Sequence, residues 1–402
     1  MQPATFDVVI VGSGIVGLST AQELLQRNPK MNIAILEKEA RAGVHASGRN
    51  SGVMHCGIFY GADTLKAKVC AAGAARMQQF ALSHGIAYNR SGKLVLATDE
   101  SQLPSVERLL KNASDNGITA VRFTPQQAAE IEPFAAPAAA AIYCPDTAVI
   151  DSASVVQKLR LLLEEKGVTF IFAAEVNAIN PQQKTVTTTA GTYAYGYLFN
   201  CAGAYADRVA RMFDLAHDYA LVPFKGIYWK LNAETQHKVR ANIYPVPDTS
   251  LPFLGIHLTR VISGDVYLGP TAIPALGREN YHGLGGINLA ETAKIMAMFA
   301  GMYGRNKQNF RKLTHMELAK YTKRTFFNTA RKLMPSLKME DMVPTKKAGI
   351  RPQLVNRKTG MLEMDYIFES SEHSLHVLNT ISPAFTSSFA FAEMIVDRSG
   401  IA

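Results

Sequence analysis

Residues 7–39 decide the fold of this chain, and they run DVVIVGSGIVGLSTAQELLQRNPKMNIAILEKE. The β-branched apolar run at 8–11 predicts a buried strand. Residues 15–25 carry apolar positions at helical spacing, and the apolar run at 33–36 predicts a second strand. A strand, a tight turn, a helix and a second strand in this order predict the start of an α/β domain.

Three glycines between the first strand and the helix have the G-x-G-x-x-G spacing of a dinucleotide-binding turn. Gly12 permits the turn, Gly14 lets the backbone approach a pyrophosphate, and Gly17 lets helix and strand pack closely. The first N–H groups of the helix offer hydrogen bonds to that pyrophosphate. Glu37 ends the second strand, where its carboxylate can accept hydrogen bonds from a ribose. This placement favours a dinucleotide site over a glycine-rich turn with only a packing role.

The segment that follows Glu37 helps to choose between NAD and FAD. Residues 42–60, AGVHASGRNSGVMHCGIFY, form a long polar stretch rich in glycine. NAD enzymes usually continue into another compact βα unit, whereas flavoproteins of the glutathione-reductase and D-amino-acid-oxidase kinds run such a loop towards the flavin. Residues 197–203, YLFNCAG, predict a later strand that ends in small residues beside the dinucleotide, followed by a helix. Both segments favour FAD.

Eight segments together resemble the L-2-hydroxyglutarate oxidase/dehydrogenase family, which belongs to the FAD-dependent D-amino-acid-oxidase superfamily. They are SGRNSGVMHCGIFY at 47–60, LKAKVCAAGAARM at 65–77, GKLVLAT at 92–98, VPFKGIYWKL at 222–231, IYPVPDTSLPFLGIHLTR at 243–260, YLGPTAI at 267–273, AGIRPQLV at 348–355 and ISPAFTSS at 381–388. The resemblance therefore extends over nearly the whole chain. Arg49 and Lys225 depart from it, because they stand where His and Arg, respectively, are often expected.

The resemblance implies an α/β fold with a Rossmann-like FAD-binding domain and a second, antiparallel-sheet substrate domain, as in D-amino-acid and glycine oxidases. It implies a discontinuous FAD domain of residues 1–88, 151–219 and 345–402, with residues 89–150 and 220–344 forming the substrate domain. Motif, loop and resemblance together predict the FAD-binding residues Gly12, Gly14, Ile15, Val16, Gly17, Glu37, Lys38, Ser47, Asn50, Ser51, Gly52, Val53, Val176, Cys201, Ala202, Gly203, Pro383, Thr386 and Ser387.

The remaining pattern changes predict further elements along the chain. The predicted helices lie at 65–84, 101–116, 125–131, 151–166, through most of 289–333, and at 386–398. The predicted strands begin at 89–97, continue as short strands up to residue 200, run as long strands through 221–270, and end with 375–379. No internal repeat or low-complexity linker interrupts them.

Composition predicts a folded cytoplasmic enzyme. Hydrophobic residues make up 48% and charged residues 19% of 402 residues, a balance that excludes a disordered chain. No apolar run approaches the roughly 18 residues of a membrane span, and the chain enters its first strand at once, so we expect no signal peptide. Cys56, Cys70, Cys144 and Cys201 lack C-x-x-C spacing, which suits a reducing compartment and predicts neither disulfides nor a metal site.

The net charge of +9 is compatible with nucleic acid, anionic lipid or an acidic small molecule as partner. Without an aromatic RNA-binding signature or a basic recognition helix, we expect no nucleic acid. Basic residues gather between 305 and 347, where one interpretation is a solvated helix surface. The other is peripheral contact with the inner face of the cytoplasmic membrane, where a quinone acceptor is found.

Oxidation of a 2-hydroxy acid requires a hydride to leave C2 for the flavin and a base to take the hydroxyl proton. Histidine is the natural base near neutral pH. His55 is the first candidate, because it closes the glycine-rich loop and related glycerol-3-phosphate-oxidising flavoproteins have a histidine after a similar loop. His257 in GIHLTR is the second candidate. Strand alternation predicts that His257 and Arg260 face opposite sides.

A carboxylate substrate favours a planar, bidentate arginine. Arg351 in AGIRPQ is the best candidate, because related amino-acid oxidases hold the substrate carboxylate with an arginine in a similar Gly-x-Arg-Pro context. The alternative is a surface arginine before a proline turn. A second carboxylate needs further donors, for which the candidates are Lys225, Arg260, Tyr60 and His257. The helix after SPAFTSS is expected to direct N–H groups at the flavin, and ordinary Ser/Thr capping is the alternative.

The resemblance implies an FAD-dependent enzyme that converts L-2-hydroxyglutarate to 2-oxoglutarate and passes electrons to O2, a quinone or an electron-transfer protein. A D-amino-acid or glycine oxidase that acts on an amine is the first alternative. A non-catalytic flavin-binding protein is the second.

Overall fold

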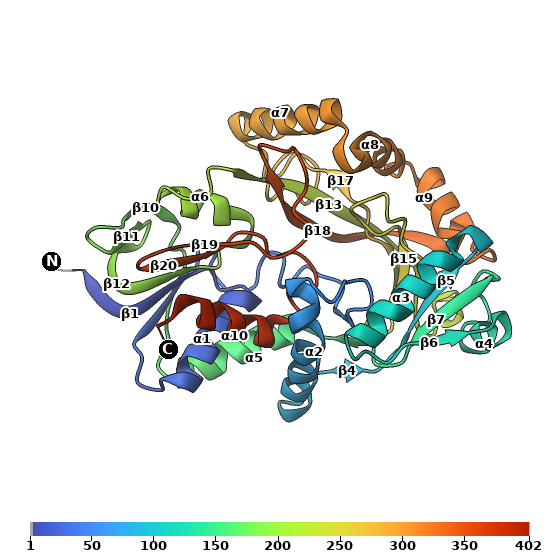
Figure 1. The fold of residues 1–402 in the computed structure, drawn as a ribbon, viewed down its shortest axis with the longest axis horizontal. Coiled ribbons are helices and arrows are strands. Elements are labelled where there is room, and N and C mark those ends of the chain that lie inside the picture. The colour runs from blue at the N-terminus through green and yellow to red at the C-terminus, as the bar shows by residue number, and fades with distance from the viewer. Residues whose placement is uncertain (1–2, 402) are drawn as a thin grey trace.

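Two large sheets organise the chain in the computed structural model, which describes residues 3–401 (Figure 1). The first sheet has eight strands and the second has nine. They form two halves side by side, and both marked chain ends lie in the half that contains the first sheet (Figure 1). The predicted α/β fold with a separate, largely antiparallel second sheet is confirmed.

The first sheet is built around the strand that opens the sequence motif. Strand β1 (Ala4–Val11) pairs in parallel with β2 (Ile33–Leu36) on one side and with β12 (Gly191–Asn200) on the other. Its other strands are β9 (Thr169–Ile171), β10 (Val176–Asn180), β11 (Thr185–Thr188), β19 (Phe368–Ser371) and β20 (Ser374–Val377). The predicted strand at 33–36 therefore has the predicted bounds.

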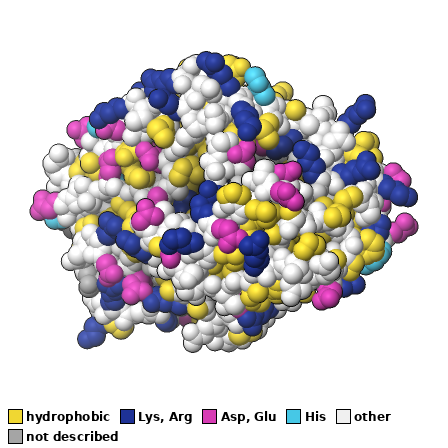
Figure 2. Space-filling model, turned by 45° about the vertical axis from the view of Figure 1, so that its right-hand side comes forward, with side chains coloured by type: hydrophobic (Ala, Val, Ile, Leu, Met, Phe, Trp, Pro, Cys, Tyr) yellow, Lys and Arg dark blue, Asp and Glu magenta, His cyan; other side chains and the backbone are white. Residues whose placement is uncertain are grey.

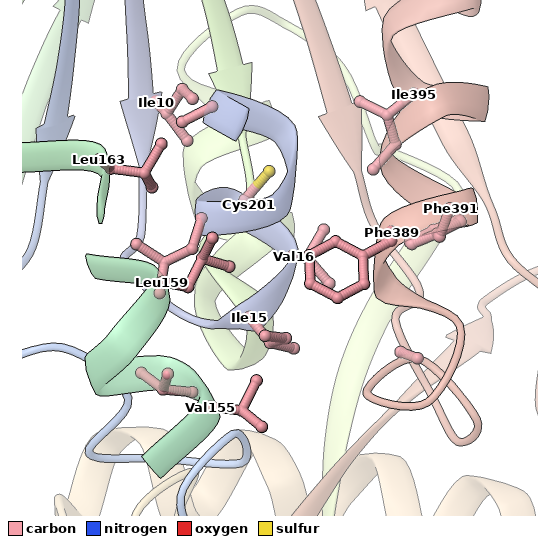
Figure 3. Packing of buried hydrophobic residues seen from close by; sticks show 14 of the residues in the cluster. Ile10, Ile15, Val16, Val155, Leu159, Leu163, Cys201, Phe389, Phe391 and Ile395 are labelled. Carbon is pink, nitrogen blue, oxygen red and sulfur yellow. The ribbon is translucent and has the colours of Figure 1, made fainter. Parts of the chain in front are cut away.

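Four helices belong to this half: α1 (Ile15–Arg27), α2 (Leu65–Ser83), α5 (Ser152–Glu165) and α10 (Ser388–Ser399). Helix α1 packs between α5 and α10, and Figure 3 shows Val16 of α1 facing Phe389 of α10. Asp151 caps α5 by accepting hydrogen bonds from the N–H groups of Ala153 and Ser154. These apolar contacts fix the start of α1 relative to the sheet.

The second sheet is dominated by two long antiparallel strands, β13 (Tyr219–Leu231) and β18 (Met342–Asn356). Its other strands are β5 (Lys93–Ala97), β6 (Val121–Phe123), β7 (Ala140–Cys144), β14 (Asn242–Pro245), β15 (His257–Arg260), β16 (Val266–Gly269) and β17 (Ile273–Pro274). The predicted domain boundary at residue 345 is corrected by this pairing, because it assigned most of β18 to the FAD domain.

Helices around the second sheet follow the predicted helical regions. They are α3 (Leu103–Asp115), α4 (Pro125–Ile131), α7 (Leu289–Arg305), α8 (Phe310–Ala319) and α9 (Lys323–Ala330), while the short α6 (Ala206–Arg211) follows β12. A small third sheet of β3 (Val53–Met54), β8 (Ala148–Ile150) and β4 (Tyr88–Asn89) joins the long loop after β2 to the entry of α5.

The surface gives no single charged patch on the face that Figure 2 shows. Lys and Arg side chains are spread there among acidic and apolar side chains (Figure 2). Within residues 3–401, no helix is both long and apolar enough to cross a membrane.

Candidate active site

A cavity of ≈ 560 Å³ is lined by residues from both halves of the molecule. From the first half it is lined by Gly12 after β1 and Cys201 after β12, and from the second by Tyr244, His257 and Arg351. We call the part around the start of α1 and the end of β2 the nucleotide end. The part around His55, His257 and Arg351 is the substrate end.

The nucleotide end is shaped by the turn between β1 and α1. Gly12 has a φ of +104°, and a Cβ there would lie 2.6 Å from the carbonyl oxygen of Cys201. Gly14 is the N-cap of α1 and, as a glycine, provides no capping side chain. The N–H of Ile15 donates to Ser47 Oγ at 2.9 Å. Although this bond occupies the N–H of Ile15, the start of α1 at Gly14, Ile15 and Val16 lines the cavity, and a helix start in this position is the arrangement that binds phosphate groups.

Gly17 and Glu37 complete the motif in different ways. A Cβ on Gly17 would lie 2.1 Å from the carbonyl oxygen of Gly12, so Gly17 has the packing role expected of it. Glu37 is buried, and its Oε2 accepts hydrogen bonds from Ser13 N at 2.9 Å and Ser13 Oγ at 2.7 Å. These bonds fix the carboxylate at the end of β2, where it lines the cavity.

Most of the predicted FAD-binding residues line the cavity. They are Gly12, Gly14, Ile15, Val16, Glu37, Lys38, Ser47, Asn50, Ser51, Val53, Val176, Cys201, Ala202, Gly203, Pro383 and Thr386. Gly17, Gly52 and Ser387 lie behind the lining instead. A Cβ on Gly52 would meet the carbonyl oxygen of Ile150 at 2.6 Å, and Ser387 is fully buried against Tyr366, with 3.0 Å between the hydroxyl oxygens. Gly17 has the packing role predicted for it, and the FAD contacts predicted for these three residues stay a prediction.

The C-terminal segment reaches the cavity through a turn rather than through a helix end. Residues 380–386 line it, whereas α10 begins only at Ser388. Thr386 Oγ1 accepts a hydrogen bond from the N–H of His55 at 3.2 Å and so joins this turn to the long loop. The expected direct role of the α10 N-terminus is corrected to this preceding turn.

Polar side chains that the sequence did not single out link the loop after β17 to the nucleotide end. Glu279 Oε1 lies 2.7 Å from both Lys38 Nζ and the Tyr205 hydroxyl. His45 Nδ1 lies 2.8 Å from the Tyr281 hydroxyl. Although burial lowers it, hydrogen bonds to Glu279 and Glu39 raise the pKa of Lys38 above its ordinary value. A single sequence offers no signal for such pairs, because their members lie far apart along the chain.

Glu39, His45 and Glu279 lie near one another in a way that resembles a metal site, with ligand atoms within 4.8 Å. The ammonium of Lys38 forms ion pairs with both carboxylates. Lys38 therefore takes the place of a cation, and the cluster is an ion-pair network.

The nucleotide end fits FAD on these observations. An uncapped helix start suits the pyrophosphate, and the fixed carboxylate of Glu37 suits a ribose. The cavity then continues past the turn of residues 380–386 to the substrate end, which leaves room for a flavin ring between them.

His257 at the substrate end is held in one tautomer. Its ring stacks on Tyr244 with a centroid separation of 4.0 Å, and its Nδ1 lies 3.1 Å from the carbonyl oxygen of Gly255. Because a carbonyl only accepts, Nδ1 carries the hydrogen and Nε2 keeps a free lone pair. Burial, with smaller contributions from the charges of Arg351 and Lys93, lowers the pKa of His257 to about 4. The imidazole is therefore neutral at neutral pH and can accept a proton.

His55 also lines the cavity, and its main chain is fixed on both sides. Its N–H donates to Thr386, and its carbonyl oxygen accepts from Cys70 Sγ at 3.3 Å. Among residues 3–401, no group is hydrogen-bonded to its ring nitrogens. Burial first, then the nearby charges of Lys93, His257 and Arg351, lower the pKa of His55 to about 3.

Arg351 is a cation without an acidic partner. Its guanidinium lies 4.9 Å from the ring centroid of Phe253, and no carboxylate in the described chain is within ion-pair distance of it. Burial lowers the pKa of Arg351, with the charges of Tyr228, Tyr60 and Glu317 acting in the opposite direction. A desolvated cation of this kind is stabilised when an anion enters the cavity.

Lys225 and Arg260, which the sequence suggested for a second carboxylate, lie outside the cavity lining. Lys225 Nζ donates to Asn280 Oδ1 at 2.7 Å. Arg260 Nη1 donates to the carbonyl oxygens of Gln236 at 3.1 Å and Val239 at 3.0 Å. Neither residue is therefore kept as a candidate for binding the second carboxylate. His257 lines the cavity and Arg260 does not, which agrees with the predicted opposite orientation of the two side chains.

Tyr60 is likewise absent from the lining, and its ring centroid lies 5.5 Å from Lys66 Nζ. Burial lowers the pKa of Lys66 to about 7 and raises that of Tyr60 well above its ordinary value. The Tyr60 hydroxyl therefore stays protonated at neutral pH, and Lys66 is charged only in part.

Aromatic residues of the second sheet line the cavity, and sequence analysis missed them. Phe224, Gly226 and Tyr228 alternate towards it along β13, and Tyr244 and Phe253 add further walls. The alternation was present in VPFKGIYWKL as a period of two.

Comparisons with known proteins agree with this site. The chain matches the FAD dependent oxidoreductase family over residues 7–398. It is 34% identical over 397 residues to an L-2-hydroxyglutarate dehydrogenase of Indibacter alkaliphilus, and the match covers 98% of each chain. It is 33% identical to the human mitochondrial L-2-hydroxyglutarate dehydrogenase, covering 98% of this chain and 89% of that protein. The protein of that name in Escherichia coli K12 is 32% identical, with 98% and 93% covered.

Two solved oxidase structures have a fold similar to that of this chain. An L-α-glycerophosphate oxidase from Mycoplasma pneumoniae with FAD bound superimposes with a TM-score of 0.79, at 20% identity and over 100% of this chain and 96% of that chain. A glycine oxidase from Geobacillus kaustophilus gives a TM-score of 0.72 at 18% identity, covering 99% and 96%. The first of these structures carries its FAD in the same overall architecture.

Proposed function

The chain belongs to the L-2-hydroxyglutarate dehydrogenase family of FAD-dependent oxidoreductases, and from this premise we propose that it oxidises L-2-hydroxyglutarate to 2-oxoglutarate. The relatives named for this activity support the substrate. The observation that carries the proposal is the unpaired guanidinium of Arg351, which lies in one cavity with two neutral imidazoles.

Arg351 binds the carboxylate next to the reacting carbon in this proposal. A guanidinium offers two parallel N–H donors, which fix both the position and the plane of a carboxylate. Tyr228 replaces Lys225 and Arg260 as the candidate donor to the distal carboxylate, because it lines the cavity. Burial raises the pKa of Tyr228 well above its ordinary value, so its hydroxyl keeps the proton that it donates.

The bound FAD supplies a two-electron acceptor for the hydrogen on C2. The protein's task is to take the hydroxyl proton, and His55 and His257 are the two groups that line the cavity with neutral imidazoles. Because their pKa values are lowered, the two imidazoles are weak bases before substrate binds. A dianionic substrate beside them favours the charged imidazolium and raises both values towards neutrality. Substrate binding therefore makes the histidine that accepts the hydroxyl proton a stronger base.

Anaerobic mixing of the purified holoenzyme with candidate donors tests the proposal. L-2-hydroxyglutarate should bleach the flavin absorbance and yield 2-oxoglutarate, whereas the D enantiomer should leave the absorbance unchanged. Bleaching only by glycine or D-amino acids would instead establish the amine-oxidising alternative. A flavin spectrum that no donor changes would establish a non-catalytic flavin-binding protein.

A quinone in an anionic membrane is the electron acceptor that we propose, in preference to O2 or an electron-transfer protein. Helices α7 and α8 and the turn after them expose large apolar side chains, namely Leu289, Met296, Tyr303, Met316, Leu318 and Tyr321. Basic residues flank them between 305 and 347. Exposed apolar groups beside lysines favour the surface of an anionic bilayer. Co-sedimentation with phosphatidylglycerol vesicles, but not with phosphatidylcholine vesicles, is the expected result, and a Leu289→Glu/Met296→Glu variant should remain in the supernatant.

A further inference from the structure

Lys93 is a fully buried cation that the proposed reaction does not use. It is 0% exposed at the start of β5, where its neighbours across the sheet are Cys144 of β7 and Asn242 of β14. No carboxylate of residues 3–401 forms an ion pair with it. A lysine in such a place either loses its proton or has an anion nearby.

The group that Lys93 does contact is a thiol. Lys93 Nζ lies 3.4 Å from Cys56 Sγ, and its remaining surroundings are the ring faces of Phe59 at 4.6 Å and Tyr244 at 5.5 Å from their centroids. Aromatic faces attract a cation but not a neutral amine. The surroundings of Lys93 therefore favour an ammonium ion, and the sulfur of Cys56 is the only partner that can supply the opposite charge among the residues the structure describes.

The sulfur of Cys56 accepts a hydrogen bond from the ammonium of Lys93. The thiol of Cys144, the ammonium of Lys93, the N–H of Ile58 and the hydroxyl of Thr147 all act to lower the pKa of Cys56 well below the ordinary value, against burial. Cys70 is a contrast, because burial raises its pKa to about 12 and its thiol donates to the carbonyl oxygen of His55. Cys56 Sγ thus accepts a hydrogen bond from Lys93, whereas Cys70 Sγ donates one to a carbonyl oxygen.

The pair lies directly behind the two histidines of the substrate end. Cys56 follows His55 in the chain, and the ring of Tyr244 contacts both Lys93, whose Nζ lies 5.5 Å from the ring centroid, and His257, whose ring stacks on it at 4.0 Å. We propose that Lys93 and Cys56 form a buried ammonium–thiolate pair that serves as a positioning unit for the proton-accepting histidine. Burial keeps both imidazoles neutral before substrate arrives, the ammonium of Lys93 adds to this effect, and Cys56 keeps Lys93 charged.

Other ionisable groups face the pair and enter any pH dependence. They are Cys144 on β7, Tyr244 on β14, Cys70 on α2, His55 in the loop after β3, His257 on β15 and Arg351 on β18. Although burial lowers it, the charge of Cys56 and its hydrogen bond from Lys93 help to raise the pKa of Lys93 above its ordinary value.

Infrared spectroscopy of the S–H stretching band tests the thiolate without reference to catalysis. The chain has four cysteines, so a Cys56 thiolate leaves only three S–H groups at neutral pH. Cys56→Ser should therefore leave the band intensity of the holoenzyme unchanged, whereas the matched control Cys70→Ser should remove one thiol's share. A loss of the same size in Cys56→Ser would overturn the proposal. Because this readout needs no substrate, it is independent of the proposed function.

The positioning role is tested by the pH profile of anaerobic flavin reduction, and this part rests on the proposed function. Lys93→Met removes the charge, and Cys56→Ser lets buried Lys93 lose its proton, so both should shift the acidic limb to higher pH. The double variant should shift it no further than either single one, because the two residues act as one unit. A lower rate with an unmoved acidic limb in folded, flavin-loaded variants would show a merely structural role. Failure of the wild type to reduce would instead contradict the proposed function.

Discussion

The two ends of the cavity treat charge in opposite ways. At the nucleotide end the charged side chains have partners: Lys38 Nζ lies 2.7 Å from Glu279, and buried Arg278 Nη2 lies 3.0 Å from Asp207 Oδ2. At the substrate end Arg351 has no acidic partner within the described residues, and His55 has none for its ring. Charged side chains at the nucleotide end therefore stabilise the fold through ion pairs, whereas Arg351 at the substrate end is available to bind an anionic ligand.

A desolvated charge without a partner costs free energy, whereas a well-bonded pair offsets much of that cost. The substrate end therefore carries a cost that an anionic substrate relieves on binding. At the nucleotide end, backbone N–H groups of α1 suit the pyrophosphate, and the carboxylate of Glu37, already fixed by Ser13, suits the ribose. Substitutions at the nucleotide end should consequently lower the thermal midpoint, whereas those at the substrate end should change the kinetics of flavin reduction.

The largest effect is expected for the proton acceptor. His55→Ala should slow flavin reduction by about 10²–10⁴-fold, the usual contribution of a general base. His257→Ala is measured in parallel by stopped-flow reduction under nitrogen. In the wild type, reduction at low substrate concentration should stay constant as the pH falls through 6.5 and decline only towards pH 4, because the pKa values of His257 and His55 are lowered to about 4 and about 3. If only His257→Ala slows flavin reduction, His257 is the proton acceptor. If both variants reduce the flavin at the normal rate, neither histidine accepts the proton.

Asp207→Asn should affect stability instead. Asp207 is fully buried, and the neutral amide leaves the buried guanidinium of Arg278 with Glu291 as its remaining charged partner. Removal of one member of a buried pair costs about 3–5 kcal/mol. We expect a clearly lower thermal midpoint of the holoenzyme, with the reduction rate of the folded fraction preserved. A variant with a normal midpoint and a strongly reduced rate would show that this pair belongs to the chemistry.

Arg351→Lys keeps the charge at the substrate end but loses the planar pair of donors. Loss of a charge-assisted pair in a desolvated site costs roughly 2–5 kcal/mol of binding. The substrate concentration that half-saturates flavin reduction should rise accordingly, while the flavin spectrum and the thermal midpoint stay unchanged. An unchanged concentration dependence would exclude Arg351 as the carboxylate clamp.

The nucleotide end was largely predictable because its signal is local. The glycines at 12, 14 and 17 and the strand at 33–36 lie within one short stretch, and their spacing determines both geometry and chemistry. Gly52 and Ser387 lie behind the lining, because sequence neighbours of cavity residues can point into the core.

The substrate end was only partly predictable, because it is assembled from segments far apart in the chain. His257 and Arg351 lie on different strands, and their shared cavity depends on the pairing of the second sheet. Lys225 was misplaced although the alternation of Phe224 and Tyr228 already pointed it to the opposite face. The partners of Lys93 could not be foreseen, since a lysine in a strand is ordinarily expected at the surface.

The smallest effect is expected for Lys38→Met, and it tests whether the two ends are energetically separate. Lys38 is half-buried and contacts Glu39 and Glu279. A partly exposed ion pair contributes about 0.2–1 kcal/mol. The thermal midpoint, followed by the rise of flavin fluorescence on FAD release, should therefore fall slightly, and added salt should narrow the difference from the wild type. Substrate saturation should not change, because Arg351 keeps its surroundings. If Lys38→Met raises the half-saturating substrate concentration as much as Arg351→Lys does, charge at the nucleotide end also recruits the substrate, and the contrast between the two ends fails.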